Sequence, residues 1–272
     1  MFGPDEITTD GFLGGRLTIA QPAAGYRAAT DPVLLAAAVA AKPGQAVLEL
    51  GCGAGVASLC LGWRVAGLAL AGLEVQPAYG ALARRNAEAN GQDLEVFDGD
   101  LAAMPAVLRS RTFDHVIANP PYFGAGSGTA ARDPGRETAQ REATPLGDWI
   151  DAGLRRLRPG GWLTLIQAAE RLPGILVALG RRAGSVTVLP VAPRPGRAAG
   201  RVIVTARKGG RAPFRLMAPF VLHEGAAHLR DGDDYSAQAR AVLREGAALP
   251  GLDPPAVNLS AGAWPASRAD AV

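Results

Sequence analysis

An apolar run that stops at two consecutive prolines constrains the fold of this chain more than any other feature. Residues 113–118 have the composition of a buried strand, and Pro120 and Pro121 cannot donate to a sheet ladder, so the strand must end at Asn119. In open α/β sheets, ligands bind at the carboxyl ends of the strands. The Asn119 side chain and the Pro120 carbonyl would offer two acceptors to one amino group, and Tyr122 would offer a flat face to a planar group. The sequence therefore predicts a binding site at this strand end.

A second buried strand, residues 46–50, runs into the glycine loop Gly51–Gly55 and then into a predicted helix. Glycines allow the backbone of such a loop to turn tightly and to approach a ligand closely. The dinucleotide-binding fingerprint requires its third glycine at position 56, where this chain has Val56. Glu49 lies two residues before the loop and suits a cationic ligand better than a pyrophosphate. Spacing and charge therefore favour a ligand that is cationic or carries an ammonium.

Acidic residues mark the ends of two further predicted strands. Residues 68–75 end near Glu74, and residues 93–97 are followed by Asp98 and Asp100. An acid at the end of the second strand can bind both hydroxyls of a ribose. Asp100 is placed to accept a hydrogen bond from an adenine amino group. The pattern favours a ligand that contains a nucleoside.

Composition limits the classes of protein to which the chain can belong. With 272 residues, of which 48% are hydrophobic, it can form one large α/β domain. It has no uninterrupted apolar run of about 18 residues, the length needed to cross a bilayer. The first residues lack the basic segment of a signal peptide, which predicts a cytoplasmic protein. The two cysteines, Cys52 and Cys60, and three scattered histidines predict neither a disulfide framework nor a metal site.

Basic residues are unevenly distributed, although the formal net charge is only +3. Between Arg171 and His223 there are ten basic residues and no Asp or Glu. Genomic bias can explain why arginine replaces lysine, but not why acids are absent. The segment therefore predicts a phosphate-binding face and a nucleic-acid partner, with an ordinary solvated face as the alternative. The residues of this segment that are predicted to bind substrate are Arg194, Arg197, Arg201 and Lys208.

Turn and cap signals assign the N-terminal segments. Residues 6–20 predict a hairpin that turns at Gly14 and Gly15, a pair that readily takes positive φ. Asp31 is the predicted N-cap of a helix whose first residue is Pro32.

Strand and loop signals assign the rest of the chain. Residues 185–191 and 202–206 predict two strands that pair antiparallel, because the loop between them is too short for a crossover helix. The polar stretch 124–143 is a candidate mobile lid, and residues 246–272 predict a poorly ordered C-terminal tail.

The glycine loop, Glu74, Asp100 and the Asn-Pro-Pro-Tyr motif occur in an order that resembles the class I S-adenosylmethionine-dependent methyltransferases. Within that group the chain is similar to the amino-methylating enzymes that carry the same motif, in particular to the bacterial tRNA1(Val) adenine-N6-methyltransferase family, which modifies the adenine next to the anticodon. Residues 26–35 and 201–209 match that family as well. The resemblance covers roughly residues 6–245.

The resemblance implies a fold and a domain organisation. The expected fold is a Rossmann-like, seven-stranded, mostly parallel sheet of order 3-2-1-4-5-7-6, with strand 7 antiparallel and helices on both faces. We expect a single domain over residues 1–245, with residues 6–30 as a hairpin extension.

The resemblance also implies a role for each residue that matches the family by position. The implied cofactor is S-adenosyl-L-methionine, and its binding residues are Thr30, Asp31, Glu49, Gly51, Cys52, Gly53, Ala54, Gly55, Glu74, Val75, Asp98, Gly99, Asp100 and Asn119. The implied catalytic residues are Asn119, Pro120, Pro121 and Tyr122, and Phe123 would join Tyr122 in stacking on the target base. Glu49 departs from the family pattern, since many relatives have Asp at this position.

The predicted reaction is direct methyl transfer to an exocyclic amino nitrogen, and the favoured target is N6 of an adenine in tRNA. Two alternatives share the motif: N5-methylation of a glutamine in a release factor and N2-methylation of a guanine in rRNA. The release-factor enzymes usually carry a helical domain before the glycine loop, whereas 50 residues precede Gly51 here. An NAD-dependent oxidoreductase would leave residues 119–122 without a role. A non-catalytic RNA-binding module would explain the arginines but not the acids at the strand ends.

Overall fold

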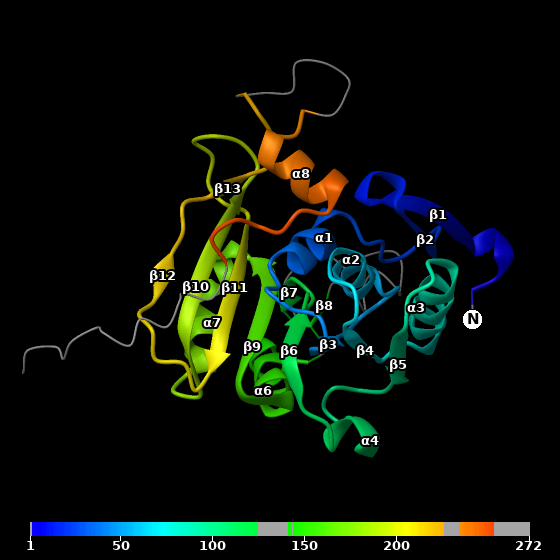
Figure 1. Ribbon diagram of the computed structural model, residues 1–272, viewed down its shortest axis with the longest axis horizontal. Helices are drawn as coiled ribbons and strands as arrows, with labels where there is room; N and C mark the ends of the chain where they lie inside the picture. The colour runs from blue at the N-terminus through cyan, green and yellow to red at the C-terminus, as the bar shows by residue number, and fades with distance from the viewer. Residues whose placement is uncertain (1, 125–140, 143, 226–233, 253–272) are drawn as a thin grey trace, which may run out of the picture.

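A central sheet with helices on both faces forms the body of the protein, as Figure 1 shows. The computed structural model describes residues 2–124, 141–142, 144–225 and 234–252. The strands of the central sheet are β3 (Ala46–Leu50), β4 (Ala69–Glu74), β5 (Leu94–Asp98), β6 (Phe113–Ala118), β9 (Leu157–Ala168), β10 (Ala183–Ala192), β11 (Arg201–Lys208), β12 (Arg215–Leu216) and β13 (Phe220–Val221).

The order of the seven longer strands is β5-β4-β3-β6-β9-β11-β10. In chain order this is 3-2-1-4-5-7-6, and β11 runs antiparallel to both of its neighbours, so the predicted order and the antiparallel strand are confirmed. The sheet nevertheless has nine strands rather than seven, because β12 and β13 pair in parallel with the outer edge of β10. The predicted number was wrong because strands of two residues leave no alternating pattern in a sequence.

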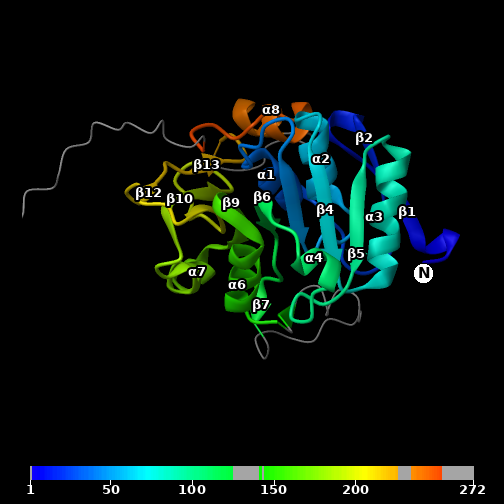
Figure 2. The same ribbon diagram turned by 60° about the horizontal axis from the view of Figure 1, so that its bottom comes forward.

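The helices cover the two faces of the sheet, and Figure 2 shows both layers. One face packs against α1 (Thr30–Ala37), α2 (Val56–Arg64), α3 (Pro77–Ala89) and α8 (Ala237–Glu245), and the other against α4 (Ala106–Arg109), α6 (Leu146–Arg156) and α7 (Leu172–Leu179). Along β6, Ile117 joins the first core while Val116 and Ala118 join the second, as the alternation of side chains in a strand requires. Among the helices of the described ranges, none has the length and apolarity that a membrane-spanning helix needs.

The N-terminal hairpin consists of β1 (Ile7–Phe12) and β2 (Leu17–Pro22), which pair antiparallel from Ile7 opposite Pro22 to Phe12 opposite Leu17. The turn lies at Gly14 and Gly15, whose φ angles are +67° and +88°, so the predicted hairpin is confirmed. Short 3₁₀ turns precede and close the hairpin at Pro4–Glu6 and Leu13–Gly15, and a third lies at Ala169–Arg171.

Other predicted segments fall only partly within the described ranges. Of the candidate lid, the short parallel pair β7 (Phe123–Gly124) and β8 (Arg141–Glu142) is described, and most of the rest lies outside those ranges. Most of the predicted tail also lies outside them. Leu249 and Leu252 are buried, and the Leu249 amide donates to Ala37 at 2.8 Å, so the packed chain continues beyond residue 245.

Asn86 on α3 joins the hairpin to the glycine loop. Its Oδ1 accepts from the Ala20 amide at 2.8 Å, and its Nδ2 donates to the carbonyls of Ala20 at 3.0 Å and Ala54 at 2.9 Å. The side chain is 1% exposed. Because one buried amide satisfies backbone groups on both segments, it fixes the hairpin against the loop that follows β3.

We expect Asn86→Ala to lower the free energy of unfolding by about 3 kcal/mol, because it leaves buried backbone groups without partners. Asn90→Ala is the matched control. Asn90 makes the same kind of paired contact, with the Thr18 amide and carbonyl at 2.9 Å, but at the surface, where water can replace it. Its Nδ2 also donates to the Asn86 carbonyl at 2.7 Å within α3, a contact that Asn86→Ala leaves in place. The control should cost less than about 1 kcal/mol. Urea denaturation measures both, and equal losses would contradict the assigned role of Asn86.

Candidate functional site

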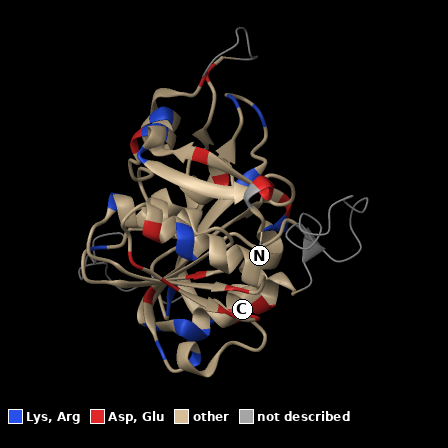
Figure 3. Ribbon diagram, turned by 90° about the vertical axis from the view of Figure 1, so that its right-hand side faces the viewer, with Lys and Arg blue, Asp and Glu red and all other residues tan. Residues whose placement is uncertain are grey.

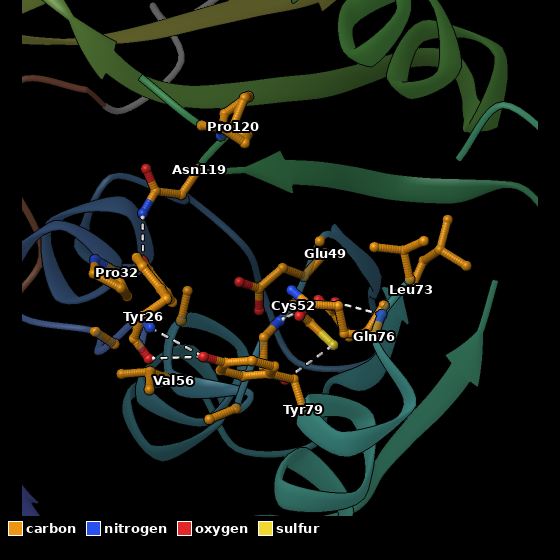
Figure 4. A pocket seen from close by; sticks show the side chains of 18 of the residues that line it. Tyr26, Pro32, Glu49, Cys52, Val56, Leu73, Gln76, Tyr79, Asn119 and Pro120 are labelled. Carbon is orange, nitrogen blue, oxygen red and sulfur yellow. Dashed lines mark hydrogen bonds between the residues drawn. The ribbon is translucent and has the colours of Figure 1, made fainter. Parts of the chain in front are cut away.

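A cavity of about 470 Å³ lies at the carboxyl ends of β3, β4 and β6, and Figure 4 shows it from close by. Its volume falls in the range of small-molecule sites. It connects the glycine loop with Asn119, so the two regions that the sequence singled out face one space. The predicted site residues that line it are Asp31, Glu49, Gly51, Cys52, Gly53, Ala54, Glu74, Val75, Gly99, Asp100, Asn119, Pro120, Pro121, Tyr122 and Arg201.

The glycine loop takes backbone conformations that other residues rarely adopt. The φ angles of Gly51, Gly53 and Gly55 are +65°, +54° and +84°. A Cβ at Gly51 would lie 2.6 Å from the Trp149 ring, whereas a Cβ at Gly53 would meet nothing within 4 Å. Gly51 therefore allows close packing behind the loop, and Gly53 leaves open space in front of it.

Glu74, at the end of β4, organises the loop electrostatically. One carboxylate oxygen accepts from the Gly53 amide at 2.8 Å, and the other accepts from the Gln76 amide at 2.9 Å. Burial raises the pKa of Glu74. Each oxygen retains a lone pair, so the carboxylate can still accept donors from a ligand in the cavity.

Glu49, in β3, is a second acid at the cavity wall, and it is 4% exposed. Its Oε2 accepts from the Ser58 amide at 2.9 Å and from the Ser58 hydroxyl at 2.5 Å. Burial raises the pKa of Glu49 from 4.5 to about 8, an effect that the bonds from Ser58 reduce and the neighbouring Glu74 increases. A cationic ligand would favour the ionised form of this group.

Asp98 and Asp100 are separated by the structure. Asp98 lies outside the cavity lining and pairs with Arg84, whose Nη2 is 2.9 Å from its Oδ2. Asp100 lines the cavity, and its Oδ1 accepts from the Ala102 amide at 2.8 Å. Of the two acids, only Asp100 is brought to the other site residues.

Asn119 presents an acceptor at the end of β6. Its Oδ1 is buried and has no hydrogen-bond partner among the described residues, while its Nδ2 lies 3.5 Å from the Tyr26 hydroxyl. Figure 4 shows the amide nitrogen directed at Tyr26 and the oxygen directed away from it. Sequence reasoning did not assign Tyr26 to the site, because its place beside Asn119 depends on tertiary packing alone.

Gln167, near the end of β9, holds the two prolines. Its Nε2 donates to the carbonyls of Pro120 and Pro121, both at 3.2 Å, and its side chain is fully buried. The Pro120 carbonyl therefore already has one donor and keeps one lone pair. Gln167 was also missed, and a glutamine at the end of a predicted strand gives no signal of its own in a sequence.

Asp31 has a different role from the one predicted. Helix α1 begins at Thr30 with Ala29 as its N-cap and without a capping side chain, so the prediction of Asp31 as N-cap was wrong. The Asp31 carboxylate instead accepts from the Tyr122 hydroxyl at 2.5 Å and pairs with Arg201. The Asp31 carboxylate therefore binds the donors of Tyr122 and Arg201 rather than the free amides at the start of α1.

The other predicted residues lie away from the cavity lining. Thr30 and Gly55 are adjacent to it in the chain but do not line it. Arg194 pairs with Asp234, and Arg197 is exposed on the loop that joins β10 to β11. Lys208 lies at the far end of β11 from Arg201, where its Nζ donates to the Leu157 carbonyl at 2.6 Å. The backbone of Phe123 belongs to β7, and its side chain is not part of what the structure describes.

Charged side chains elsewhere are mixed. On the side that carries the hairpin and β5, basic and acidic residues are interspersed, as Figure 3 shows.

Within the described ranges, no group of three or more His, Cys, Asp or Glu residues is placed to hold a metal ion. The cavity itself is lined by acids, including Glu49, Glu74 and Asp100.

Residues 29–173 match the family model of the methyltransferase small domain. Among curated proteins, the chain is 27% identical over 245 residues to a tRNA1(Val) (adenine(37)-N6)-methyltransferase of Dickeya chrysanthemi, covering 88% of this chain and 94% of that one. It is 32% identical over 162 residues to a release factor glutamine methyltransferase of Geobacter sulfurreducens, covering 56% of each. Among solved structures, a protein described as a predicted O-methyltransferase from Agrobacterium tumefaciens has a TM-score of 0.65 at 28% identity, covering 80% of this chain and 98% of that one.

We expect Glu49→Gln to gain stability relative to the parent protein as the pH rises. The folded parent keeps the Glu49 proton up to a pH of about 8, whereas the unfolded chain releases it near 4.5. The stability from burying the neutral acid is therefore complete below the unfolded pKa and declines as the pH approaches the folded pKa, by about 1.4 kcal/mol per pH unit. The variant has no such proton to lose.

Urea denaturation without added ligand at about pH 5 and about pH 8 measures this difference. The exposed Glu95→Gln variant, which loses a surface partner of Arg111, should track the parent at both pH values. A gap between Glu49→Gln and the parent that stays constant over this range would show that Glu49 is ionised in the folded protein.

Proposed function

This chain belongs to the methyltransferase small domain family and uses S-adenosyl-L-methionine, and we propose that it methylates an exocyclic amino nitrogen, namely N6 of an adenine in tRNA. The observation that carries the proposal is the Oδ1 atom of Asn119. It is a buried acceptor with no partner among the described residues, and it belongs to the same cavity as the glycine loop. Buried acceptors are rarely left unpaired in proteins, so a donor from a ligand would complete this one.

The residues at the opposite side of the cavity suit the cofactor. We propose that residues 51–54 and Glu49 hold its methionine portion, Glu74 its ribose, and Asp100 its adenine. The free lone pairs of Glu74 fit two hydroxyl donors. S-adenosylmethionine supplies an electrophilic methyl group on a positively charged sulfur, and the buried carboxyl of Glu49 can ionise to balance that charge.

The chain's own residues would hold the amine that accepts the methyl group. Asn119 Oδ1 takes one N–H, and the remaining lone pair of the Pro120 carbonyl takes the other. Two acceptors favour a pyramidal nitrogen, whose lone pair is then less conjugated with the base. Tyr122 stacks on a base that has been swung out of its loop, as enzymes acting on bases require. No strong general base is needed, because the proton leaves after the nitrogen becomes cationic, and alignment and electrostatic fit supply the rate.

Two observations support tRNA as the substrate. The relative from Dickeya chrysanthemi, which carries the name of a tRNA methyltransferase, is matched over 94% of its length. The segment from Arg171 to His223 contains no acid, and Arg197 is exposed on its β10–β11 loop at the edge of the sheet that holds the cavity. We propose one catalytic domain that covers residues 1–245 and the packed segment up to Leu252, with the hairpin as an extension. We propose that it works in the cytoplasm, where tRNA is found.

A glutamine side chain is the strongest alternative substrate. Its carboxamide nitrogen presents two hydrogens to the same pair of acceptors, and the similarity to a release factor glutamine methyltransferase favours this candidate specifically. Incubation with labelled S-adenosylmethionine and bulk tRNA, rRNA or release factor, followed by digestion, separates the candidates. We expect label in tRNA as N6-methyladenosine, and label confined to release factor would overturn the tRNA assignment.

We expect Asn119→Ala to lower turnover by about 10²- to 10³-fold, because it removes an acceptor that binds the reacting amine. The affinity for S-adenosylmethionine should change by less than about threefold, since the cofactor is held by other residues. Single-turnover kinetics and calorimetric binding measure the two effects. Asn90→Ala makes the same substitution at an asparagine outside the cavity, so it serves as the control and should keep full activity. If Asn119→Ala retains most of its activity, the acceptor mechanism is wrong.

A further inference from the structure

Three side chains from distant parts of the chain meet at the wall of the cavity. Asp31 comes from the first turn of α1, Tyr122 from the segment after β6, and Arg201 from the first position of β11. All three were predicted separately, as a cofactor contact, a stacking platform and a substrate contact. The structure joins them in one hydrogen-bonded group.

The contacts within this group are short and specific. The Tyr122 hydroxyl donates to Asp31 Oδ2 at 2.5 Å. The Nε of Arg201 donates to Asp31 Oδ2 at 2.8 Å and lies 2.7 Å from Oδ1, which is buried and accepts no hydrogen bond from the described residues. The guanidinium carbon of Arg201 is 5.8 Å from the centre of the Tyr122 ring, within the range of a cation–π contact. Tyr122 is therefore held at its hydroxyl and along its ring.

The charges in the group balance one another. The side chain of Asp31 is 15% exposed and that of Arg201 is 40% exposed, so the ion pair is partly shielded from water. Burial and the Asp31 carboxylate raise the pKa of the Tyr122 hydroxyl, which therefore stays a donor. Because its charge is paired with Asp31 and its guanidinium lies near the tyrosine ring, Arg201 has fewer free N–H donors for a phosphate than an exposed arginine has.

The backbone of Tyr122 is constrained from the opposite side. Gln167 donates to the carbonyls of Pro120 and Pro121, the two residues immediately before Tyr122, at 3.2 Å. The glutamine fixes the approach of the chain, and the Asp31–Arg201 pair fixes the side chain. The orientation of the Tyr122 ring is thus fixed through both its backbone and its hydroxyl, as a preorganised binding surface requires.

We propose that Asp31 and Arg201 are positioning residues that hold the Tyr122 ring in the orientation in which it stacks on the target base. The inference rests on the proposed function, which identifies the planar group that stacks on Tyr122 as a base. It gives Asp31 Oδ2 and Arg201 a role in holding Tyr122, in place of direct phosphate binding by Arg201. Both residues act on the substrate through Tyr122.

The test is a double-mutant cycle in kcat/KM for a tRNA1(Val) transcript. Tyr122→Phe keeps the ring but removes the hydroxyl, and Asp31→Asn removes the charge that holds it. We expect each to lower kcat/KM by about 5- to 20-fold, the scale of a weakened stacking contact. The kcat/KM of the double variant should be no more than about twofold below that of the less active single variant, because both changes break the same interaction. S-adenosylmethionine affinity should stay within about threefold.

Arg201→Lys separates positioning from phosphate binding. Lysine keeps the charge but lacks the planar group that spans Asp31 and the ring, so we expect a loss of at least about tenfold in kcat/KM. The slope of log KM against log salt should match that of the parent, whereas removing a phosphate contact would lower it by about 0.7 to 0.9. Arg181→Ala controls for net charge, because it removes an exposed arginine just before β10, which pairs there with the end of β11 far from Arg201.

Three results would overturn the inference: losses that multiply in the double variant, an Arg201→Lys enzyme with parental activity or a reduced salt slope, or an Asp31→Asn enzyme whose cofactor affinity falls more than about tenfold. If the parent labels no tRNA, the proposed substrate fails instead. The same cycle is then run on the release factor or rRNA that the parent does label, where non-additivity and cofactor affinity decide.

Discussion

The end of β6 is the constraint on which the site depends. Pro120 and Pro121 stop the strand in the middle of the sheet, beside β3, where the glycine loop also leaves the sheet. Because β3 and β6 are parallel neighbours, the segments that follow them bring Asn119 and Gly53 to one cavity. Gln167 on the next strand then fixes both proline carbonyls. The position of the acceptor is thus set by sheet register and one buried amide.

Electrostatics give the cavity its preference for a cation. Glu49 and Glu74 lie on adjacent strands and are both nearly inaccessible to water. Burial raises the pKa of each carboxyl, and the neighbouring Glu74 raises the pKa of Glu49 further. Holding two acids in this way is unfavourable in the free protein. A ligand that brings a positive charge and hydroxyl donors relieves the cost, which links binding affinity to the stability of the loop. The same acids would disfavour a pyrophosphate, in agreement with the absence of the third dinucleotide glycine at position 56.

The sequence could predict what depends on local pattern. Strand ends, the hairpin turn at Gly14 and Gly15, and the motif residues that line the cavity follow from periodicity, turn chemistry and resemblance. Side-chain partners that come from distant segments could not be predicted. Gln167 and Tyr26 join the site only because β9 and the segment before α1 pack beside Asn119, and Asp31 leaves the helix end for Tyr122 and Arg201. Lys208 was grouped with Arg201 by composition, yet the two residues lie at opposite ends of β11.

In the proposed reaction, a captured amine and the cofactor's methyl group meet at Asn119. The most direct measurement is a crystal structure of the protein with S-adenosylhomocysteine and adenosine bound together. We expect the adenine N6 atom about 3 Å from Asn119 Oδ1, with the base against the Tyr122 ring. An adenine whose amino group points away from Asn119, or an Asn119 amide turned to present its nitrogen, would contradict it.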